Sequence, residues 1–239
     1  MTFADILSLA PAFSEYTTQI PAELDGQFVL ETFPPYGLIH QKDSPLRRIG
    51  ILLRGSLRVI NEFENGNVFM IECNDAVSFI GEITLFAEET HTSVTIEAVT
   101  ECRIAFLPVP VFDAWLDSDP HFIKQMARHI AKKLYCSSYN RGERLFYSSS
   151  YLLLKYVAGE MEALGLRRME KAVLRKNRRQ ISEELGMQEK TVNRTIARLC
   201  EEGVFSLERG KIAMTHKQLL QSESRLKDYS GTSRNGAQT

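Results

Sequence analysis

The chain has 239 residues, 44% of them hydrophobic and 25% charged, with a formal net charge of −1. This length suits two domains, and the composition excludes collagen-like, low-complexity and wholly disordered chains. The start MTFADILSLAPAFSEYTT lacks the basic residues and apolar core of a signal peptide, and no stretch has the run of about 18 apolar residues that a spanning helix needs. We therefore expect a cytoplasmic protein with no membrane partner.

Residues 1–110 are expected to form an antiparallel β-roll that acts as a sensor domain. Glycines and polar turns at Gly37, Gly55, 64–66 and Gly81 separate short β-rich runs, at spacings typical of an all-β barrel or roll. Asn65-Gly66 tolerates the positive φ of a tight turn, so 56–73 is expected to form a hairpin. The runs are QFVLETF, RIGILLRG, SLRVINEF, NVFMIEC, AVSFI, TSVTIEAV and CRIAFLP.

Residues 111–147 are expected to be a long dimerisation helix, because apolar residues there recur every three or four positions. From Pro120 to about Phe146 it would span about 27 residues, or about 40 Å, more than a small domain needs for its own core. The alternative is one long helix lying across its own domain. The expected dimer interface is Ile123, Met126, Ile130 and Leu134, and the opposite face carries Lys124, Arg128, Lys132, Lys133 and Arg141.

Residues 148–228 are expected to form a winged helix-turn-helix. Ile181 and Leu185 define one buried helix face, Gly186 stands where the turn needs left-handed backbone, and a second buried face follows at Val192, Ile196 and Leu199. The hairpin predicted at 204–214 would be a wing with a basic tip. A generic three-helix bundle is the alternative, and the tail 229–239 is expected to be disordered.

The charge distribution supports a nucleic-acid partner for the second half. Up to Tyr147 there are 12 Lys and Arg against 19 Asp and Glu, a net charge of −7, and beyond it 17 against 11, a net charge of +6. Long polar side chains on the second helix can reach groove edges or phosphates of double-stranded DNA. The candidate DNA-binding residues are Arg178, Arg179, Gln180, Gln188, Glu189, Lys190, Thr191, Asn193, Arg194, Arg209 and Lys211.

Signals for catalysis and for metals are absent from the sequence. Cys73, Cys102, Cys136 and Cys200 lie 29, 34 and 64 residues apart, without a C-x-x-C pair or a nearby histidine, so buried, inert thiols are expected. No phosphate-binding loop, dinucleotide motif, nucleophile elbow or H-E-x-x-H is present. We predict no enzyme activity and no cofactor.

The order β-roll, long helix, winged helix-turn-helix resembles the cyclic AMP receptor protein and FNR superfamily of bacterial transcription regulators. The segment 79–86 followed by 92–98 is similar to the family's phosphate-binding cassette, and 180–199 is similar to its DNA-reading motif. The resemblance implies a homodimer on a two-fold DNA operator, RNA polymerase as a partner, and a small-molecule effector. The implied effector-pocket residues are Glu82, Thr92, Ser93, Thr95, Glu97, Ser137 and Ser138.

The cassette departs from the family pattern at its cationic positions. Thr92 stands where cyclic-nucleotide binders carry an arginine that neutralises the phosphate, and Glu97 replaces a second cationic position. Ser93 is retained, and Glu82 stands at the family's ribose-binding position, although Gly81-Glu82 reads first as a structural turn and helix cap. Loss of a charge-assisted contact lowers affinity by about one to two decades, so cyclic AMP is not expected to be the effector.

The other sensing chemistries of the family are not favoured either. This chain has no cysteine before Cys73, whereas the iron-sulfur branch clusters its cysteines near the N-terminus, and Cys73 and His91 are only nominal haem ligands. The leading hypothesis is a dimeric, effector-controlled transcription factor. The alternative is an effector-independent DNA-binding protein whose β-roll serves only dimerisation or partner binding.

Overall fold

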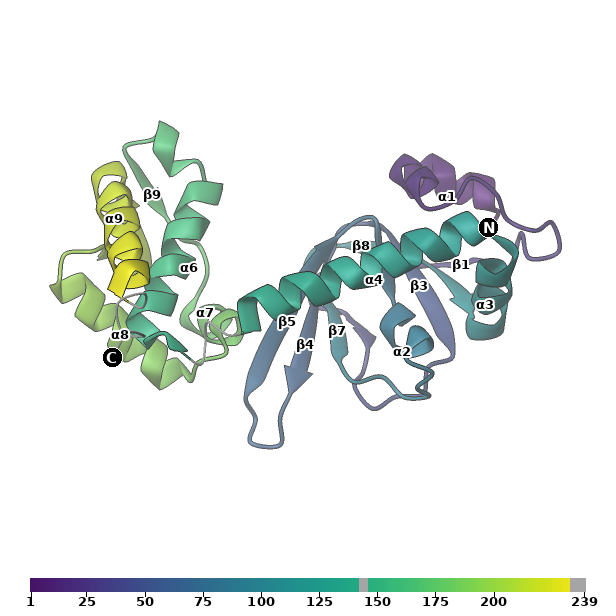
Figure 1. Ribbon diagram of the computed structural model, residues 1–239, viewed down its shortest axis with the longest axis horizontal. Coiled ribbons are helices and arrows are strands. Elements are labelled where there is room, and N and C mark those ends of the chain that lie inside the picture. The colour runs from purple at the N-terminus through teal and green to yellow at the C-terminus, as the bar shows by residue number, and fades with distance from the viewer. Residues whose placement is uncertain (142–145, 233–239) are drawn as a thin grey trace. The chain divides into compact units, whose positions relative to one another are not determined.

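The computed structural model, drawn in Figure 1, describes residues 1–141 and 146–232. It divides into two units, Met1–Ser138 and Tyr139–Thr239. The first unit holds two four-stranded sheets and the first 19 residues of the long helix, and the second holds helices with one three-stranded sheet. Most of the expected dimerisation helix is thus part of the first unit.

Two antiparallel sheets form the β-roll predicted for the first unit, and every β-rich run of the sequence contains a strand. One sheet orders β1 (Val29–Phe33), β8 (Cys102–Pro108), β3 (Arg48–Arg54) and β6 (Ser78–Ile80). The other orders β2 (Leu38–His40), β7 (Thr95–Ala98), β4 (Ser56–Glu62) and β5 (Val68–Asp75). The short strand β2 was not expected; it has three residues and an irregular register against β7.

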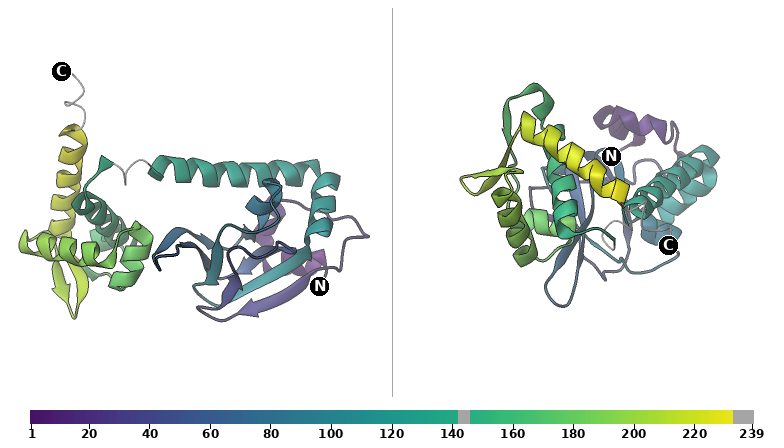
Figure 2. Two further views of the ribbon diagram at one scale, coloured as in Figure 1. Left: turned by 90° about the horizontal axis from the view of Figure 1, so that it is seen from below. Right: turned by 60° about the vertical axis from the view of Figure 1, so that its left-hand side comes forward.

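The sheet that contains β3 is covered on both faces, which explains its continuous apolar sequence. Ile49, Ile51 and Leu53 point to a core shared with the helices α1 (Phe3–Leu9), α3 (Val109–Ser118) and α4 (Pro120–Arg141) and the 3-10 turn η1 (Pro11–Glu15). Leu52 points to a second core between the two sheets. A strand buried on both faces loses the alternation of apolar and polar residues that a half-exposed strand shows. Figure 2 shows α4 lying along the roll.

Helix α4 begins at Pro120, as predicted. Asp119 has an extended backbone conformation that ends α3, and its side chain caps the N-terminus of α4. One carboxylate oxygen of Asp119 accepts hydrogen bonds from the backbone N–H groups of His121 and Phe122, at 2.9 and 3.0 Å. The hydroxyl of Thr17 donates to the other oxygen at 2.5 Å. The segment 111–147 is therefore two helices, and its stretch 142–145 lies outside the described residues.

Helix α4 has two distinct faces within the first unit. Phe122 and Met126 are fully buried in the core under the sheet. Ile123 and Leu134 are 40% and 64% exposed. Met126 thus packs inside its own chain, and its assignment to the dimer interface is wrong. Ala127, one residue further along, lies on the exposed side.

The second unit is a helix-turn-helix with a small sheet, as predicted. Its helices are α6 (Ser149–Ala163), α7 (Arg178–Leu185), α8 (Glu189–Glu201) and α9 (His216–Thr232), with a 3-10 turn η2 (Leu166–Arg168). The sheet orders β10 (Ser206–Glu208), β11 (Lys211–Thr215) and β9 (Lys171–Val173). The predicted wing is the hairpin β10–β11, and the strand β9 was not expected.

Helix α9 corrects the predicted disorder of the tail, because residues 229–232 belong to it. Leu219 is fully buried on this helix, and Leu226 packs on the same core. The ring of Tyr229 lies 5.5 Å from that of Tyr151 on α6. Residues 233–239 of the tail lie outside the described part of the chain.

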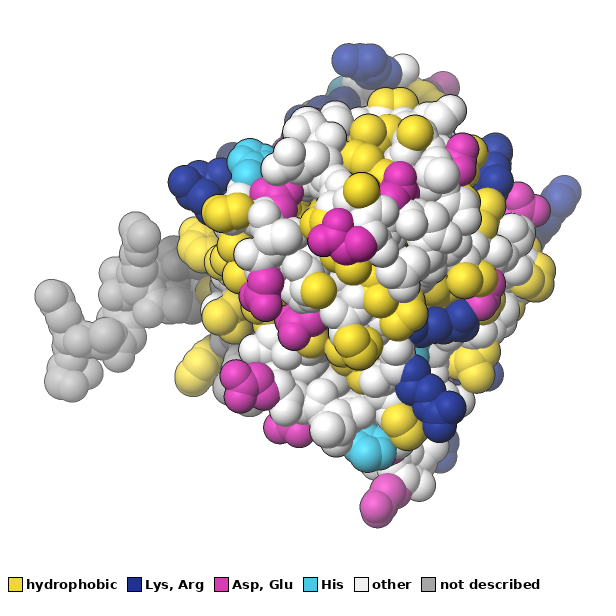
Figure 3. Space-filling view, turned by 90° about the vertical axis from the view of Figure 1, so that its right-hand side faces the viewer, with side chains coloured by type: hydrophobic (Ala, Val, Ile, Leu, Met, Phe, Trp, Pro, Cys, Tyr) yellow, Lys and Arg dark blue, Asp and Glu magenta, His cyan; other side chains and the backbone are white. Residues whose placement is uncertain are grey.

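The surface of the first unit is mixed in character. Figure 3 looks at this unit from its α1 and α3 side and shows acidic, basic and apolar side chains interspersed with uncharged ones. Within the described residues, no helix is long and apolar enough to cross a membrane. The same residues contain no group of three His, Cys, Asp or Glu side chains able to hold a metal ion.

Candidate functional site

The turn between α7 and α8 follows from local sequence. Gly186 ends α7 with φ 60° and ψ 36°, the left-handed conformation that glycine adopts without a Cβ penalty. Asn177 and Gln180 form a capping box at the start of α7: each side chain accepts a hydrogen bond from the backbone N–H of the other, at 2.9 Å in both cases. The amide oxygen of Gln180 is thus engaged in the cap.

Helix α8 is strongly amphipathic. Val192, Ile196 and Leu199 are buried in the core of the second unit. Lys190, Asn193 and Arg194 are exposed on the other side of the helix. Among the described residues, Lys190 and Arg194 make no hydrogen bond or ion pair, whereas Arg179 on α7 is held by Glu183 at 2.9 Å. The two α8 cations are therefore available to an outside anion.

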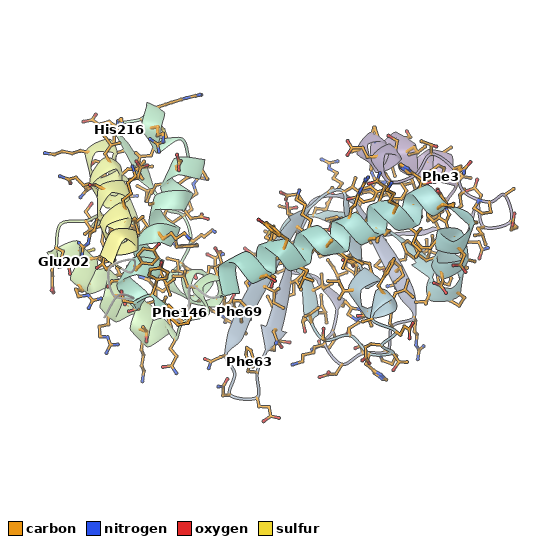
Figure 4. All side chains as sticks on the ribbon, viewed as in Figure 1. Phe3, Phe63, Phe69, Phe146, Glu202 and His216 are labelled. Carbon is orange, nitrogen blue, oxygen red and sulfur yellow. The ribbon has the colours of Figure 1, made fainter. Side chains whose placement is uncertain are left out.

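The other predicted DNA-binding residues differ in their accessibility. Glu189 and Gln188 are exposed at the start of α8, and Arg209 is exposed in the β10–β11 turn with φ 48°. The half-exposed residues are Arg178, Gln180, Thr191 and Lys211. Glu202, labelled in Figure 4, lies at the far end of α8. Its carboxylate is bound by Arg225 of α9 at 2.5 Å, so the charge of Glu202 is already balanced.

A second candidate site is a cavity of about 370 Å³ in the first unit. Its walls are the β-roll, the short helix α2 (Glu82–Phe86) and the helix α4. Gly81 precedes α2 with φ 88°, and a Cβ there would lie 2.7 Å from the Leu46 side chain, so this bend requires glycine. Of the predicted pocket residues, Glu82, Thr92, Ser93 and Ser137 line the cavity; Ile130 and Leu134 of the predicted dimer interface also line it.

Lys133 was predicted on the helix face opposite the dimer interface, but it lines the cavity. Its ammonium group lies 2.8 Å from Glu82 and 2.9 Å from Glu72, and only 14% of its side chain is exposed. Burial opposes the charged form of Lys133, but the two carboxylates outweigh it and raise the pKa of the amine. Burial raises the pKa of Glu82, and Lys133 only partly counteracts this. Lys133 is therefore a buried pocket residue and not part of a solvated face.

The two histidines near this cavity are neutral at pH 7. Burial, assisted by the positive charge of Lys133, lowers the pKa of His129 to about 4. Burial also lowers the pKa of His40. The hydroxyl of Thr92 donates to the carbonyl of Gln41 at 3.0 Å, so it accepts from Nε2 of His40 at 2.7 Å. Thr92 is 3% exposed, and its hydrogen bonds are satisfied within the chain.

Three predicted pocket residues lie elsewhere. Glu97 is bound by Arg58, with Nη2 and Oε2 2.6 Å apart, and Thr95 donates to Glu62 at 2.9 Å. Along β7 the side chain of Ile96 faces the cavity, so its neighbours on both sides face away. Ser138 does not line the cavity either. Glu97 is thus paired with Arg58 and does not line the cavity, contrary to the expectation from the cassette.

Two polar pocket residues, Lys133 and His40, were not predicted from the sequence, for different reasons. Lys133 follows Phe122, Met126 and His129 at helical spacing, and this inward register was the signal that could have revealed it. His40 lies on β2, a strand that was not anticipated, and only the pairing of β2 with β7 brings it to Thr92.

Comparison with known proteins agrees with this architecture. Residues 30–119 match the family model of the cyclic nucleotide-binding domain. The chain is 26% identical over 109 residues to the cAMP-activated global transcriptional regulator CRP of Salmonella typhimurium, covering 46% of this chain and 51% of that protein. The chain thus spans about half the length of this relative.

Two further proteins are similar over nearly the whole chain. The CRP-like cAMP-activated global transcriptional regulator of Mycobacterium tuberculosis is 20% identical over 225 residues, which are 92% of this chain and 99% of that protein. A crystal structure of a transcriptional regulator from Eubacterium rectale superposes with a TM-score of 0.71 at 14% identity, covering 91% of this chain and 99% of that one.

Proposed function

Because the chain belongs to the CRP/FNR family of transcription regulators, we propose that it binds a two-fold DNA operator as a homodimer, sequence-specifically. The observation that carries this proposal is the outer face of α8, where Lys190, Asn193 and Arg194 are exposed. A helix with this surface fits the major groove, where arginine can read a guanine and asparagine an adenine. The family is one of non-enzymatic regulators.

The wing adds a second, less specific contact. Arg209 stands in the turn of the β10–β11 hairpin, and Lys211 follows it in β11. Cations at a hairpin tip suit the sugar-phosphate backbone, which fixes orientation but carries no sequence information. The N-terminal end of a recognition helix approaches base edges. This end of α8 carries Gln188, Glu189 and Thr191.

Dimerisation is proposed through the exposed face of α4. Regulators of this family bind DNA as dimers. Ile123, Ala127, Ile130 and Leu134 follow each other at intervals of four, three and four residues, the spacing of a coiled-coil seam. Two copies related by a two-fold axis place two α8 helices for two half-sites.

The effector that controls this regulator is proposed not to be a cyclic nucleotide, although the Salmonella and M. tuberculosis relatives are cAMP-activated. Thr92 is buried and satisfied within the chain, and Lys133 already balances two carboxylates. A cyclic phosphate would thus meet no free cation among the described residues that line the cavity. Isothermal titration of the full chain with cyclic AMP should give no saturable heat; a dissociation constant in the low micromolar range would overturn this part.

The DNA proposal is tested by selection from a random duplex library with the full-length protein. The expected product is a palindromic consensus whose half-sites lie about one helical turn apart, bound by two copies of the chain. A pool without enriched sequence would instead favour an effector-independent, nucleoid-type protein. Binding of one copy to an asymmetric site would contradict the dimer model.

A further inference from the structure

The cavity between the β-roll and α4 has the size of a small-molecule site. Its volume of about 370 Å³ lies within the usual range for ligand pockets, about 300–1,000 Å³. All of its lining residues belong to the first unit, so its shape does not depend on the DNA-binding part. The kind of ligand that it accepts can therefore be inferred from side chains of the first unit alone.

The walls of this cavity are predominantly apolar. Strands β4, β5 and β7 contribute Val59, Ile71 and Ile96, and the segments around α2 contribute Phe79, Ile83 and Val94. Ile71 and Ile83 are 43% and 48% exposed in the chain, although both are large apolar side chains. A ligand that covered such side chains would remove apolar surface from water, which is favourable for binding.

The polar groups of the cavity offer no free cation to an anion among the described residues, since Thr84, Ser93 and Ser137 contribute hydroxyl groups only. Thr92 and His40 are engaged with each other, and burial lowers the pKa of His40, so this pair is uncharged at pH 7. The charged groups are Lys133, Glu72 and Glu82, which together carry one net negative charge when all are ionised. An incoming anion would have to displace Glu72 or Glu82 from Lys133, or lie next to both carboxylates and be repelled by them.

We propose that this cavity binds a largely apolar, uncharged small molecule and discriminates against organic anions of the same shape. The inference rests on the proposed function in one respect, since it assigns the class of effector to the same sensor domain. Apolar walls supply the affinity, and the Glu72–Lys133–Glu82 group supplies the selectivity. The recognised feature is an apolar body without a negative charge.

Two dyes that share one ring system test the proposal. N-phenyl-1-naphthylamine is uncharged, and 1-anilinonaphthalene-8-sulfonate adds a sulfonate to the same rings; both become brighter in apolar surroundings. Titration of the full chain should give one site per chain for the neutral dye, with at least about tenfold tighter binding than for the sulfonate. Equal or tighter binding of the sulfonate would overturn the proposal.

Variants locate the dye in the cavity. Val94→Trp fills the space and Ile71→Asn removes apolar wall at a partly exposed position, so each should weaken neutral-dye binding by about tenfold or more. Val29→Asn is the matched control, since Val29 is 55% exposed on β1 and does not line the cavity. Unchanged dye binding in folded Ile71→Asn, or equal losses in Val29→Asn, would refute the site.

The sign of the charge effect is tested separately with Glu72→Gln. Glutamine retains an acceptor for the side-chain amide of Asn74, which donates to Glu72 at 2.8 Å, while one negative charge is removed. The ratio of sulfonate affinity to neutral-dye affinity should rise in this variant; an unchanged ratio contradicts the proposed selectivity. Because dye binding needs no DNA, retained dye binding with failed operator selection would overturn the proposed function alone, and the reverse result would overturn the ligand class alone.

Discussion

Lys133 ties helix α4 to two other elements of the first unit. Its ammonium group is shared by Glu72 of β5 and Glu82 of α2, and the Glu82 side chain is only 3% exposed. Removing one member of a buried ion pair leaves an uncompensated charge, which is more harmful than replacing both members. The position of α4 on the roll thus depends on a charge balance as well as on apolar packing.

Lys133→Met should lower the free energy of unfolding by about 3–5 kcal/mol in urea titrations at pH 7. The double variant Lys133→Met with Glu82→Gln should recover much of this loss. Since burial already raises the pKa of Glu82, the single variant's deficit should shrink as the pH falls and Glu82 takes up a proton. A deficit that is equal at all pH values, or equal in the double variant, contradicts this explanation.

Arg194 is predicted to read a base edge. Arg194→Ala should weaken binding to the selected operator by about 1–3 kcal/mol and relax the preference at one symmetric position. Lys217→Ala is the charge-matched control, because Lys217 is exposed at the start of α9, away from the β10–β11 turn. The readout is fluorescence anisotropy on a panel of single-base operator variants. Equal loss on every duplex would make Arg194 a phosphate contact instead.

At the scale of elements, α4 combines two helical stripes that the sequence does not separate. Phe122 and Met126 pack into the core, while Ile123 and Leu134 stay exposed, yet all four are apolar and Ile123 directly follows Phe122. Periodicity predicts a helix and its start at Pro120. Which stripe faces inward is decided by α1, α3 and the sheet, which are remote in sequence.

The two stripes should respond differently to substitution. Leu134→Glu places a charge on a position that is 64% exposed in the single chain, so it should leave the fold intact and dissociate the dimer. Met126→Ala should lower stability by about 2–5 kcal/mol without changing the association state. Sedimentation velocity at micromolar concentration measures the first effect and thermal unfolding the second. A dimeric Leu134→Glu protein would contradict the seam.

The DNA-binding elements were predictable because their signals are local. Gly186 marks the turn, and the spacing of Val192, Ile196 and Leu199 defines the inner face of α8 and with it the outer one. The pocket was predictable only in part. Thr92 and Glu82 could be placed from the cassette, but the pairing of Glu97 with Arg58 and of Glu82 with Lys133 depends on contacts between distant segments.

At the scale of the whole molecule, the near-zero net charge conceals a functional division. The part up to Tyr147 carries −7 and the remainder +6, and the cavity and the recognition helix lie in different units. The overall architecture could be predicted because strand runs and helical stripes are long. Two short strands were missed: β2 and β9 have three residues each and depend on the strands that pair with them, β7 and β11.

Equilibrium binding of the full chain to its selected duplex and to a scrambled duplex of equal composition tests the central claim most directly. The account predicts that the selected duplex binds at least about 10³-fold more tightly near physiological salt. It also predicts that affinity for the scrambled duplex falls steeply as salt rises, because that binding is electrostatic. Affinities that agree within a few-fold at every salt concentration would contradict a sequence-specific regulator.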